Sequence, residues 1–290
     1  MSTTDPSASE PLLRLLNTGK WYPKNGVGMA RIIRDINLTV SRGEIITVVG
    51  PSGCGKSTLL GGIGGFTPFN EGTQEINVRG EWRPLGEPDK HRGVVFQDYP
   101  VPEFLSAIDN VALGLDLSGL GLIQNCIPFL ARRKKRTYRR EAESYLNSVG
   151  LSEHADKFPR ELSGGQRQRV AIAQALAMKP EILLMDEPFS GLDPKSREGL
   201  QVLVQEIHKE LNNTIFFVTH DLEEAVYLGT RIIVLSHLQD DVPGAKIVHD
   251  QTLQEYKSPE AKASPEFAEL IQLLRSKFAF GNPKNIKLKI

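Results

Sequence analysis

The sequence predicts an α/β protein with a mainly parallel β-sheet, and three observations support this. Short apolar runs rich in β-branched residues recur along the chain, as expected for strands buried on both faces. Segments with helical spacing lie between these runs. A glycine-rich loop directly follows the first run. The runs are residues 44–49, 182–185, 215–218 and 232–235, and the helical patterns include Gln166–Met178 and Lys195–Leu211.

Composition is ordinary for a globular chain of 290 residues, with 40% apolar and 24% charged residues. Lys plus Arg equals Asp plus Glu at 35 each, so net charge gives no electrostatic reason to bind nucleic acid or an acidic membrane. The two cysteines, Cys54 and Cys126, indicate neither a disulfide framework nor a zinc site, which fits a reducing compartment. We find no apolar run of about 18 residues that would span a bilayer.

Four segments of the chain stand out by their pattern. Residues 1–11 are polar and acidic, which predicts a disordered leader and not a secretion signal. Residues 12–49 have a strand-like pattern broken by turns. Residues 101–160 contain few β-branched runs, which predicts a helical insertion. From Lys257 onward, a mixed stretch leads into an amphipathic segment around Phe267–Phe278 and then a tail.

The glycine-rich loop fits the pattern GxxxxGK[ST] and lies between a predicted buried strand and a predicted helix, which is the context that the motif requires. Backbone N–H groups of such a loop turn inward around phosphates, and the helix dipole adds to the attraction. Lys56 is expected to neutralise β- and γ-phosphate oxygens, and Ser57 to ligate Mg²⁺. The loop comprises Gly50, Pro51, Ser52, Gly53, Cys54, Gly55, Lys56, Ser57 and Thr58.

Four glycines crowd the helix expected after this loop: Gly61, Gly62, Gly64 and Gly65. An interior glycine costs a helix about 1 kcal/mol relative to alanine. We therefore expect packing, and not intrinsic propensity, to hold this helix.

A pair of carboxylates ends the apolar strand at residues 182–185. At the carboxyl end of a parallel strand, such groups face the nucleotide crevice. Asp186 is expected to hold Mg²⁺ through water, and Glu187 to polarise the attacking water as general base. A helix N-cap is the plain alternative for such a pair alone. Together with the phosphate loop, the pair indicates ATP hydrolysis.

The sequence Leu162-Ser163-Gly164-Gly165-Gln166 closely resembles the signature motif of ABC ATPases. Ser163 and the glycine N–H groups open a helix and so form a second anion site. Two anion sites in one chain suit a head-to-tail dimer, in which each signature caps the ATP of the partner.

Other elements follow in the order that this family has. Gln97 resembles the Q-loop glutamine, which reaches Mg²⁺ and the water. Residues 190–193 (Ser-Gly-Leu-Asp) resemble the D-loop, which assigns Asp193 to the nucleotide region. His220 resembles the switch histidine that contacts the γ-phosphate. Tyr22 stands where the family has an adenine-stacking aromatic, with Trp21 as the competing choice. Each alone would be an ordinary polar or packing residue, and the joint order carries the resemblance.

The resemblance implies a P-loop NTPase (RecA-like) ABC cassette with an antiparallel β subdomain and an inserted α-helical subdomain. Residues 12–255 would form the cassette, with the helical subdomain at about 101–165, and residues 256–290 a helical extension and tail. The implied activity is ATP hydrolysis coupled to solute transport, with ATP and Mg²⁺ as cofactors. The implied partners are two transmembrane permease subunits and a second cassette, identical or not, and a solute-binding protein is a further candidate. The implied location is peripheral, on the cytoplasmic face of the inner membrane.

Short phrases at residues 91–98, 109–112 and 264–267 look like those of nitrate/taurine/sulfonate-type import ATPases. An export cassette is the alternative. A soluble ABC ATPase acting on DNA or the ribosome is disfavoured, because the chain lacks a basic footprint, a long coiled-coil insertion and a second cassette. The chain departs from the family pattern in residues 99–104, which contain two prolines, and at Gln174, where arginine is common.

The stretch 117–140, apolar and then basic, is longer than the family's helical subdomain leads us to expect. Two interpretations stay open. The first is a longer helix pair with a solvated basic face. The second is a contact with the membrane subunit or acidic lipid, to which each basic residue would add about 1 kcal/mol.

Overall fold

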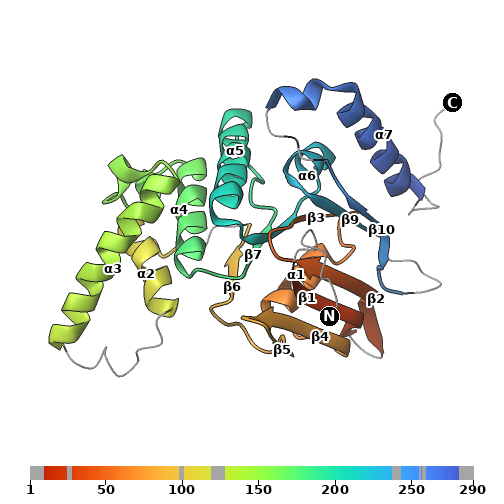
Figure 1. Cartoon of the computed structure of the whole chain (residues 1–290), viewed down its shortest axis with the longest axis horizontal. Helices are drawn as coiled ribbons and strands as arrows, with labels where there is room; N and C mark the ends of the chain where they lie inside the picture. Colours follow the sequence, from red (N-terminus) through yellow and green to blue (C-terminus); the bar gives the residue numbers. More distant parts are fainter. Residues whose placement is uncertain are drawn as a thin grey trace, which may run out of the picture. The chain divides into compact units, whose positions relative to one another are not determined.

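The computed structural model describes residues 10–24, 28–97, 101–118, 128–236, 243–254, 256 and 259–280 (Figure 1). The chain forms two compact units. The first comprises the chain up to Pro88 together with the chain from Asn212 onward, and the second comprises Asp89–Leu211. The helical insertion expected at about 101–165 lies in the second unit, whose described residues also form two strands and two further helices.

An antiparallel sheet in the first unit has the strand order β2-β1-β4-β5 (Figure 1). Its strands are β1 (Pro11–Pro23), β2 (Met29–Ser41), β4 (Glu71–Val78) and β5 (Glu81–Pro84). Along β2, Ile36, Leu38 and Val40 are buried and the residues between them are exposed. This period of two is typical of a sheet with one covered face. The antiparallel β subdomain expected from the family resemblance is confirmed.

A second sheet of the first unit has the order β10-β9-β3-β8. Strand β3 (Ile45–Val49) pairs in parallel with β8 (Thr214–Val218) and β9 (Arg231–Leu235), and β10 (Ile247–Thr252) pairs antiparallel with β9. Every residue of β3 and β8 is buried. The continuous apolar runs in the sequence therefore correspond to central parallel strands.

Helix α1 (Lys56–Gly64) follows the phosphate loop after β3. It contains three of the four glycines that crowd this part of the sequence. Gly65 is not one of them, because it is the C-cap residue, with a left-handed φ of 83°. A Cβ atom on Gly62 would lie 2.2 Å from Cζ of Phe69, so the aromatic ring occupies the space that a side chain would need. Close packing of residues 66–69 on the helix explains why glycine is present at this cost in propensity.

The Gly62→Ala variant is therefore expected to be less stable than the unsubstituted protein. Overpacking should lower the free energy of unfolding by about 1–3 kcal/mol, and the higher helix propensity of alanine should return up to about 1 kcal/mol of this. Gly61→Ala is the matched control, because the one close approach of its Cβ would be to the hydroxyl oxygen of Thr67 at 2.8 Å, and a rotation of Thr67 can relieve this. Thermal unfolding of both variants without nucleotide tests the difference. Equal melting temperatures in the two variants would contradict the packing explanation.

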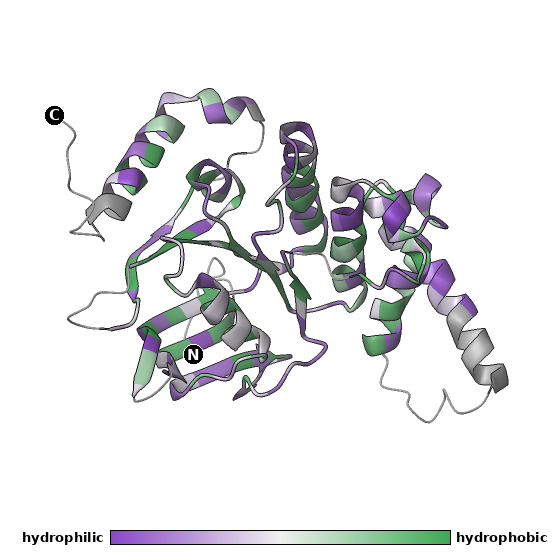
Figure 2. Ribbon diagram, turned by 180° about the vertical axis from the view of Figure 1, so that it is seen from behind, coloured by the Kyte–Doolittle hydropathy of each residue, from purple (hydrophilic) through white to green (hydrophobic). Residues whose placement is uncertain are grey.

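The carboxyl-terminal part of the first unit contains α6 (Leu222–Leu228), a 3₁₀ turn (Pro259–Ala263) and α7 (Pro265–Phe280). Phe267, Ile271 and Leu274 of α7 are buried at helical spacing, and hydrophilic and hydrophobic residues alternate along the helix in Figure 2. Helix α7 packs against α6. The predicted amphipathic segment is thus helical, and the predicted tail at 281–290 lies outside the described residues.

The second unit pairs β6 (Arg92–Val95) in parallel with β7 (Ile182–Asp186). Its helices are α2 (Ala107–Ser118), α3 (Pro128–Ser148), α4 (Gly164–Ala177) and α5 (Pro194–Leu211), with short 3₁₀ turns at Ser152–His154 and Pro159–Glu161. Helix α2 packs against both α3 and α4. Residues 119–127 of the apolar and basic stretch lie outside the described residues, so both interpretations of it remain predictions.

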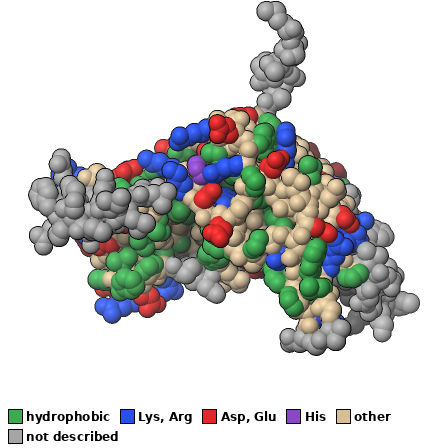
Figure 3. Space-filling model, turned by 90° about the horizontal axis from the view of Figure 1, so that it is seen from below, with side chains coloured by type: hydrophobic (Ala, Val, Ile, Leu, Met, Phe, Trp, Pro, Cys, Tyr) green, Lys and Arg blue, Asp and Glu red, His purple; other side chains and the backbone are tan. Residues whose placement is uncertain are grey.

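Within the described part of the chain, no helix is both long and apolar enough to cross a membrane. On the face shown in Figure 3, basic and acidic side chains are interspersed and not separated by sign. This distribution agrees with the balanced charge of the sequence.

Candidate nucleotide-binding site

The phosphate loop occupies the turn between β3 and α1 in the first unit. Gly53 and Gly55 have φ values of 76° and 101°, a left-handed conformation that glycine adopts without a Cβ penalty. Gly55 is also the N-cap of α1, and among the described residues no side chain caps this helix and no acidic residue lies in its first turn. The first N–H groups of the helix are therefore directed at the loop, which is the arrangement of an anion site.

Lys56 is held inside this loop and not extended into solvent. Its side chain is almost fully buried, and Nζ donates hydrogen bonds to the carbonyl oxygens of Gly50 at 2.8 Å and Pro51 at 3.1 Å. These contacts keep the ammonium group at the loop, where incoming phosphate oxygens could replace the carbonyl acceptors.

Cys54 is buried within the same loop, and burial raises the pKa of its thiol even though the nearby Lys56 ammonium lowers it. A raised pKa leaves less thiolate at any given pH, and the thiolate is the reactive form. Alkylation of Cys54 should therefore be slow at pH 7–8 and should accelerate as pH rises.

The measurement is mass spectrometry of iodoacetamide labelling in a Cys126→Ser background, in the native protein and in urea. MgATP should slow the native reaction further, because the nucleotide would cover the loop. Native labelling as fast as labelling of the unfolded chain would contradict this expectation.

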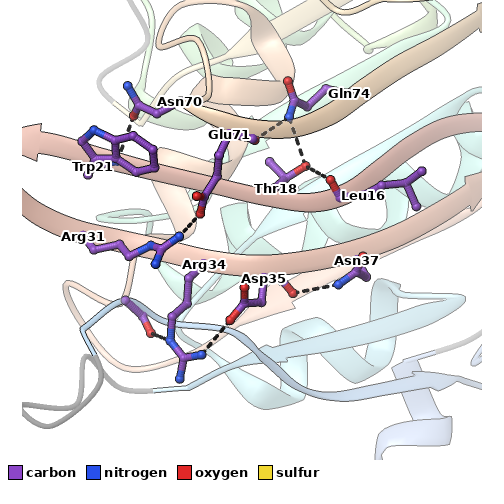
Figure 4. Close-up of polar contacts among 11 residues, drawn as sticks. Leu16, Thr18, Trp21, Arg31, Arg34, Asp35, Asn37, Asn70, Glu71 and Gln74 are labelled. Atoms are coloured by element: carbon purple, nitrogen blue, oxygen red, sulfur yellow. Dashed lines mark hydrogen bonds and ion pairs between the residues drawn. The ribbon is translucent and has the colours of Figure 1, made fainter.

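The two candidate base-stacking aromatics point to opposite faces of β1. The backbone N–H of Trp21 donates to Oδ1 of Asn70 at 2.9 Å, and the Arg31 guanidinium lies 5.7 Å from the Trp21 ring centroid (Figure 4). Arg31 in turn forms an ion pair with Glu71 (Figure 4). Tyr22 is instead next to Lys20, whose Nζ lies over its ring at 4.8 Å from the centroid.

His220 lies two residues after the end of β8 and is exposed. Because β8 and β3 are parallel neighbours, with Val218 opposite Val48, His220 and the phosphate loop leave the same edge of the sheet. The adjacent turn is well fixed: Oγ1 of Thr219 donates to the buried Oε2 of Glu224 at 2.6 Å, and Asp221 caps α6. The first unit thus brings the phosphate loop and His220 together.

Gln97 and the acidic pair lie at neighbouring strand ends in the second unit. Val95 of β6 is opposite Met185 of β7, so Gln97, two residues after β6, and Asp186, the last residue of β7, lie at the carboxyl ends of adjacent parallel strands. Gln97 is exposed, whereas Asp186 and Glu187 are partly buried. Amide, carboxylate and water oxygens at such an edge are ligands that Mg²⁺ accepts.

Glu187 has a φ of 43°, a left-handed conformation that is uncommon outside glycine. Its carbonyl oxygen accepts a hydrogen bond from the N–H of Ser190 at 3.1 Å, which closes a tight turn after β7. A conformation of this kind costs free energy and is found mainly at functional sites. It sets the direction in which the Glu187 side chain leaves the strand.

The signature residues form a capping box at the start of α4. Oγ of Ser163 accepts from the N–H of Gln166 at 3.2 Å, and Oε1 of Gln166 accepts from the N–H of Ser163 at 3.0 Å. Gly164 and Gly165 occupy the first two helical positions. Their N–H groups have no intrahelical acceptor, because no helical carbonyl lies four residues before them. The helix start is thereby fixed with its glycine donors in place for an anion.

Asp193 caps α5, and its Oδ1 accepts from the N–H of Ser196 at 3.0 Å. Hydrogen bonds from Ser196 lower the pKa of the Asp193 carboxyl. The D-loop also borders the signature, because Cβ atoms built on Gly164 and Gly165 would lie 3.4 Å from Leu192 and 3.2 Å from Ser196. The second unit thus brings the signature and the D-loop together, and Asp193 has a structural role whether or not it contacts nucleotide.

The donor set predicted for Mg²⁺ is Ser57, Gln97 and Asp186. Within the described residues, no group of three or more His, Cys, Asp or Glu side chains could hold a metal ion. A site with one carboxylate and neutral oxygens fits Mg²⁺ that is bound mainly through nucleotide phosphates and water.

Comparison with known proteins agrees with these features. Residues 33–190, more than half of the chain, match the family model described as ABC transporter. The chain is 42% identical over 254 residues to the taurine import ATP-binding protein TauB of Pseudomonas aeruginosa, covering 85% of this chain and 88% of that protein. It is 36% identical to the bicarbonate transport ATP-binding protein CmpD of Synechocystis, covering 82% of this chain and 79% of that protein.

Among solved structures, the chain resembles the dimeric bacterial ABC transporter cassette MJ0796, with a TM-score of 0.67 and 32% identity over 84% of this chain and 99% of that one. A dimer of the same cassette bound to ADP and phosphate gives a TM-score of 0.67 at 31% identity, covering 84% of this chain and 99% of that chain. The chain belongs to the ABC transporter family and carries its ATP-hydrolysing cassette. Within the family it resembles the taurine- and bicarbonate-type import ATPases.

The motifs in the sequence do not include Lys20, which lies over the ring of Tyr22. Lys20 is two positions before Tyr22, and on a β-strand that spacing puts both side chains on one face. The spacing was a usable signal, but the burial of the lysine and its position over the ring require the structure.

Proposed function

We propose that this chain hydrolyses ATP to energise the import of a small solute through separate transmembrane subunits. The observation that carries the proposal is the phosphate loop with its buried lysine, in a chain that also has the signature and a strand ending in two carboxylates. The similarity to import ATP-binding proteins supports the direction of transport.

In the proposed reaction, a water oxygen attacks the γ-phosphorus and the bond to the β,γ-bridging oxygen breaks, giving ADP and phosphate. Glu187 polarises the water and accepts its proton, and Gln97 orients it. Lys56 and His220 stabilise charge on the γ-phosphate oxygens. Mg²⁺, held by Ser57, Asp186 and Gln97, would neutralise charge on the phosphates.

Recognition of the nucleotide is assigned to two further groups. Tyr22 is the proposed platform for the adenine ring, because it stands at the family's position for the stacking aromatic; the Trp21 ring lies on the other face of β1, next to Arg31. The signature Ser163, Gly164, Gly165 and Gln166, with Asp193, would complete the site of a partner cassette in a head-to-tail dimer. The dimeric relatives support that assembly.

The proposed assembly has two cassettes on two permease subunits, at the cytoplasmic face of the inner membrane, supplied by a solute-binding protein. The two kinds of relatives named above import taurine or transport bicarbonate. Both solutes are small and carry an oxyanion group. We infer the same broad class for this chain, and the choice within the class belongs to the membrane subunits and the binding protein.

The test is purification of the tagged chain from its native membranes in mild detergent, with mass spectrometry of the proteins that accompany it. A multi-span partner is expected. The recovered complex, reconstituted in vesicles, should then take up radiolabelled taurine or bicarbonate only with MgATP on the side of the cassette. Recovery with ribosomal or DNA-maintenance proteins alone, or ATP-driven movement in the opposite direction, would contradict import.

A further inference from the structure

We propose that Lys20 is a positioning residue for the adenine base, acting through the ring of Tyr22. The proposal deepens the proposed function and depends on ATP as the nucleotide. It assigns specificity for the base to a lysine in the antiparallel sheet, outside the phosphate loop.

Lys20 is almost fully buried although its side chain is charged. Its relative exposure is 8%, and Nζ donates to the carbonyl oxygen of Pro68 at 2.7 Å. Its other contact is the face of Tyr22, 4.8 Å from Nζ to the ring centroid. A buried ammonium is costly unless it is paired, and here a carbonyl and an aromatic face provide the pairing. These two contacts fix the ammonium relative to the ring.

Lys20 is paired with a part of β2 that is next to the phosphate loop. It is opposite Ile33 in the β1–β2 pairing, whose register shifts on both sides of Lys20. A Cβ built on Gly55 would lie 2.7 Å from Cγ2 of Ile33 and 2.9 Å from Cγ2 of Ile32, so the segment of β2 opposite Lys20 contacts the loop. Tyr22 is two residues further along β1, which is about 7 Å at the rise of a strand. A nucleotide whose phosphates lie in the loop would extend its base in that direction.

The ammonium determines which side of Tyr22 is available. With Lys20 over one face of the partly exposed ring, only the opposite face can receive a base. A cation on one face also withdraws electron density from the ring, which favours stacking of an electron-rich purine on the other. Lys20 therefore orients the ring and strengthens the stack without contacting the nucleotide.

Four variants test this: Lys20→Met, which keeps the stem and removes the charge; Lys20→Arg, which keeps a cation; Tyr22→Ala; and the double variant Lys20→Met/Tyr22→Ala. Trp21→Leu is the matched control on the opposite face. For each we would measure kcat and KM for ATP, the inhibition constant of inorganic tripolyphosphate, which lacks a base, and the melting temperature.

Lys20→Met should raise the KM for ATP by roughly threefold to tenfold, from the loss of one cation–π contact, with kcat and the tripolyphosphate constant unchanged. Lys20→Arg should restore most of the affinity. Tyr22→Ala should raise KM further, and adding Lys20→Met to it should have no additional effect, because both act through one ring. Trp21→Leu should behave as the unsubstituted protein does.

Three results would overturn the inference. One is an unchanged KM for ATP in Lys20→Met. Another is an equal loss of tripolyphosphate binding in that variant, which would indicate general damage to the loop. The third is additive effects in the double variant. Failure of ATP hydrolysis, the part of the proposed function on which the inference rests, is distinguishable, because the unsubstituted chain would then hydrolyse no ATP.

Discussion

The Glu187→Gln variant should bind ATP normally while its turnover falls by roughly 10²–10⁴-fold, the usual contribution of a general base. Glutamine has nearly the same shape as glutamate and can occupy the same left-handed turn, so the fold around the φ of 43° should be retained. With binding intact and hydrolysis blocked, the signature of each chain should remain closed on the ATP of its partner. The variant should therefore accumulate as an ATP-dependent dimer.

Three measurements check this: phosphate release, ATP affinity, and size-exclusion chromatography with light scattering with and without MgATP. Glu143→Gln is the matched control, because Glu143 is exposed on α3, and it should be fully active and form no trapped dimer. Normal turnover in Glu187→Gln would remove Glu187 from the role of general base.

Loss of the lysine in the phosphate loop should act on binding and not on the chemical step alone. In Lys56→Ala, the charge that would contact the β- and γ-phosphates is absent. A charged hydrogen bond contributes about 1.5–3 kcal/mol, so the affinity for ATP should fall by roughly tenfold to a hundredfold. The variant should form no ATP-dependent dimer, in contrast to Glu187→Gln.

Because Lys56 also donates to the carbonyls of Gly50 and Pro51, its removal could loosen the loop itself. Thermal unfolding separates the two effects: a melting temperature close to that of the unsubstituted protein, together with weak ATP binding, assigns the loss to the nucleotide contact. Lys209→Ala, on the exposed side of α5, is the control for removal of a positive charge. Unchanged ATP affinity in Lys56→Ala would contradict the assigned role.

The elements that the sequence predicted well are those with a strong local pattern. Strands β3, β7, β8 and β9 are continuous apolar runs, α5 and α7 have long amphipathic periods, and α4 follows the signature motif. Strands β4, β5 and β10 were not anticipated, because they are short or lie partly in solvent and include residues such as Glu, Gly and Asp that strands disfavour. Helix α6, with seven residues, is too short for its period to be detected.

For the candidate site, motif order located the residues but not their surroundings. The reciprocal bonds of Ser163 and Gln166 follow the spacing of a capping box and could have been anticipated. The position of the Lys56 ammonium on two loop carbonyls could not, because it depends on how the turn folds back. The same is true of Gly62, where the ring of Phe69 occupies the space of a side chain. It is also true of Lys20, whose hydrogen-bond partner Pro68 lies 48 residues away in the sequence.

The pairing of β3 with β8 and β9 has a consequence for how the protein is made. The strand that supports the phosphate loop ends at Val49, but its two neighbours lie at residues 214–218 and 231–235. During synthesis at about 5–20 residues per second, the strand would wait roughly 10–40 s before both neighbours exist. Until then, an apolar run with unpaired edges is exposed on the nascent chain. Chains that stop short of residue 214 should thus bind no ATP, and they should be substrates for chaperones and proteases.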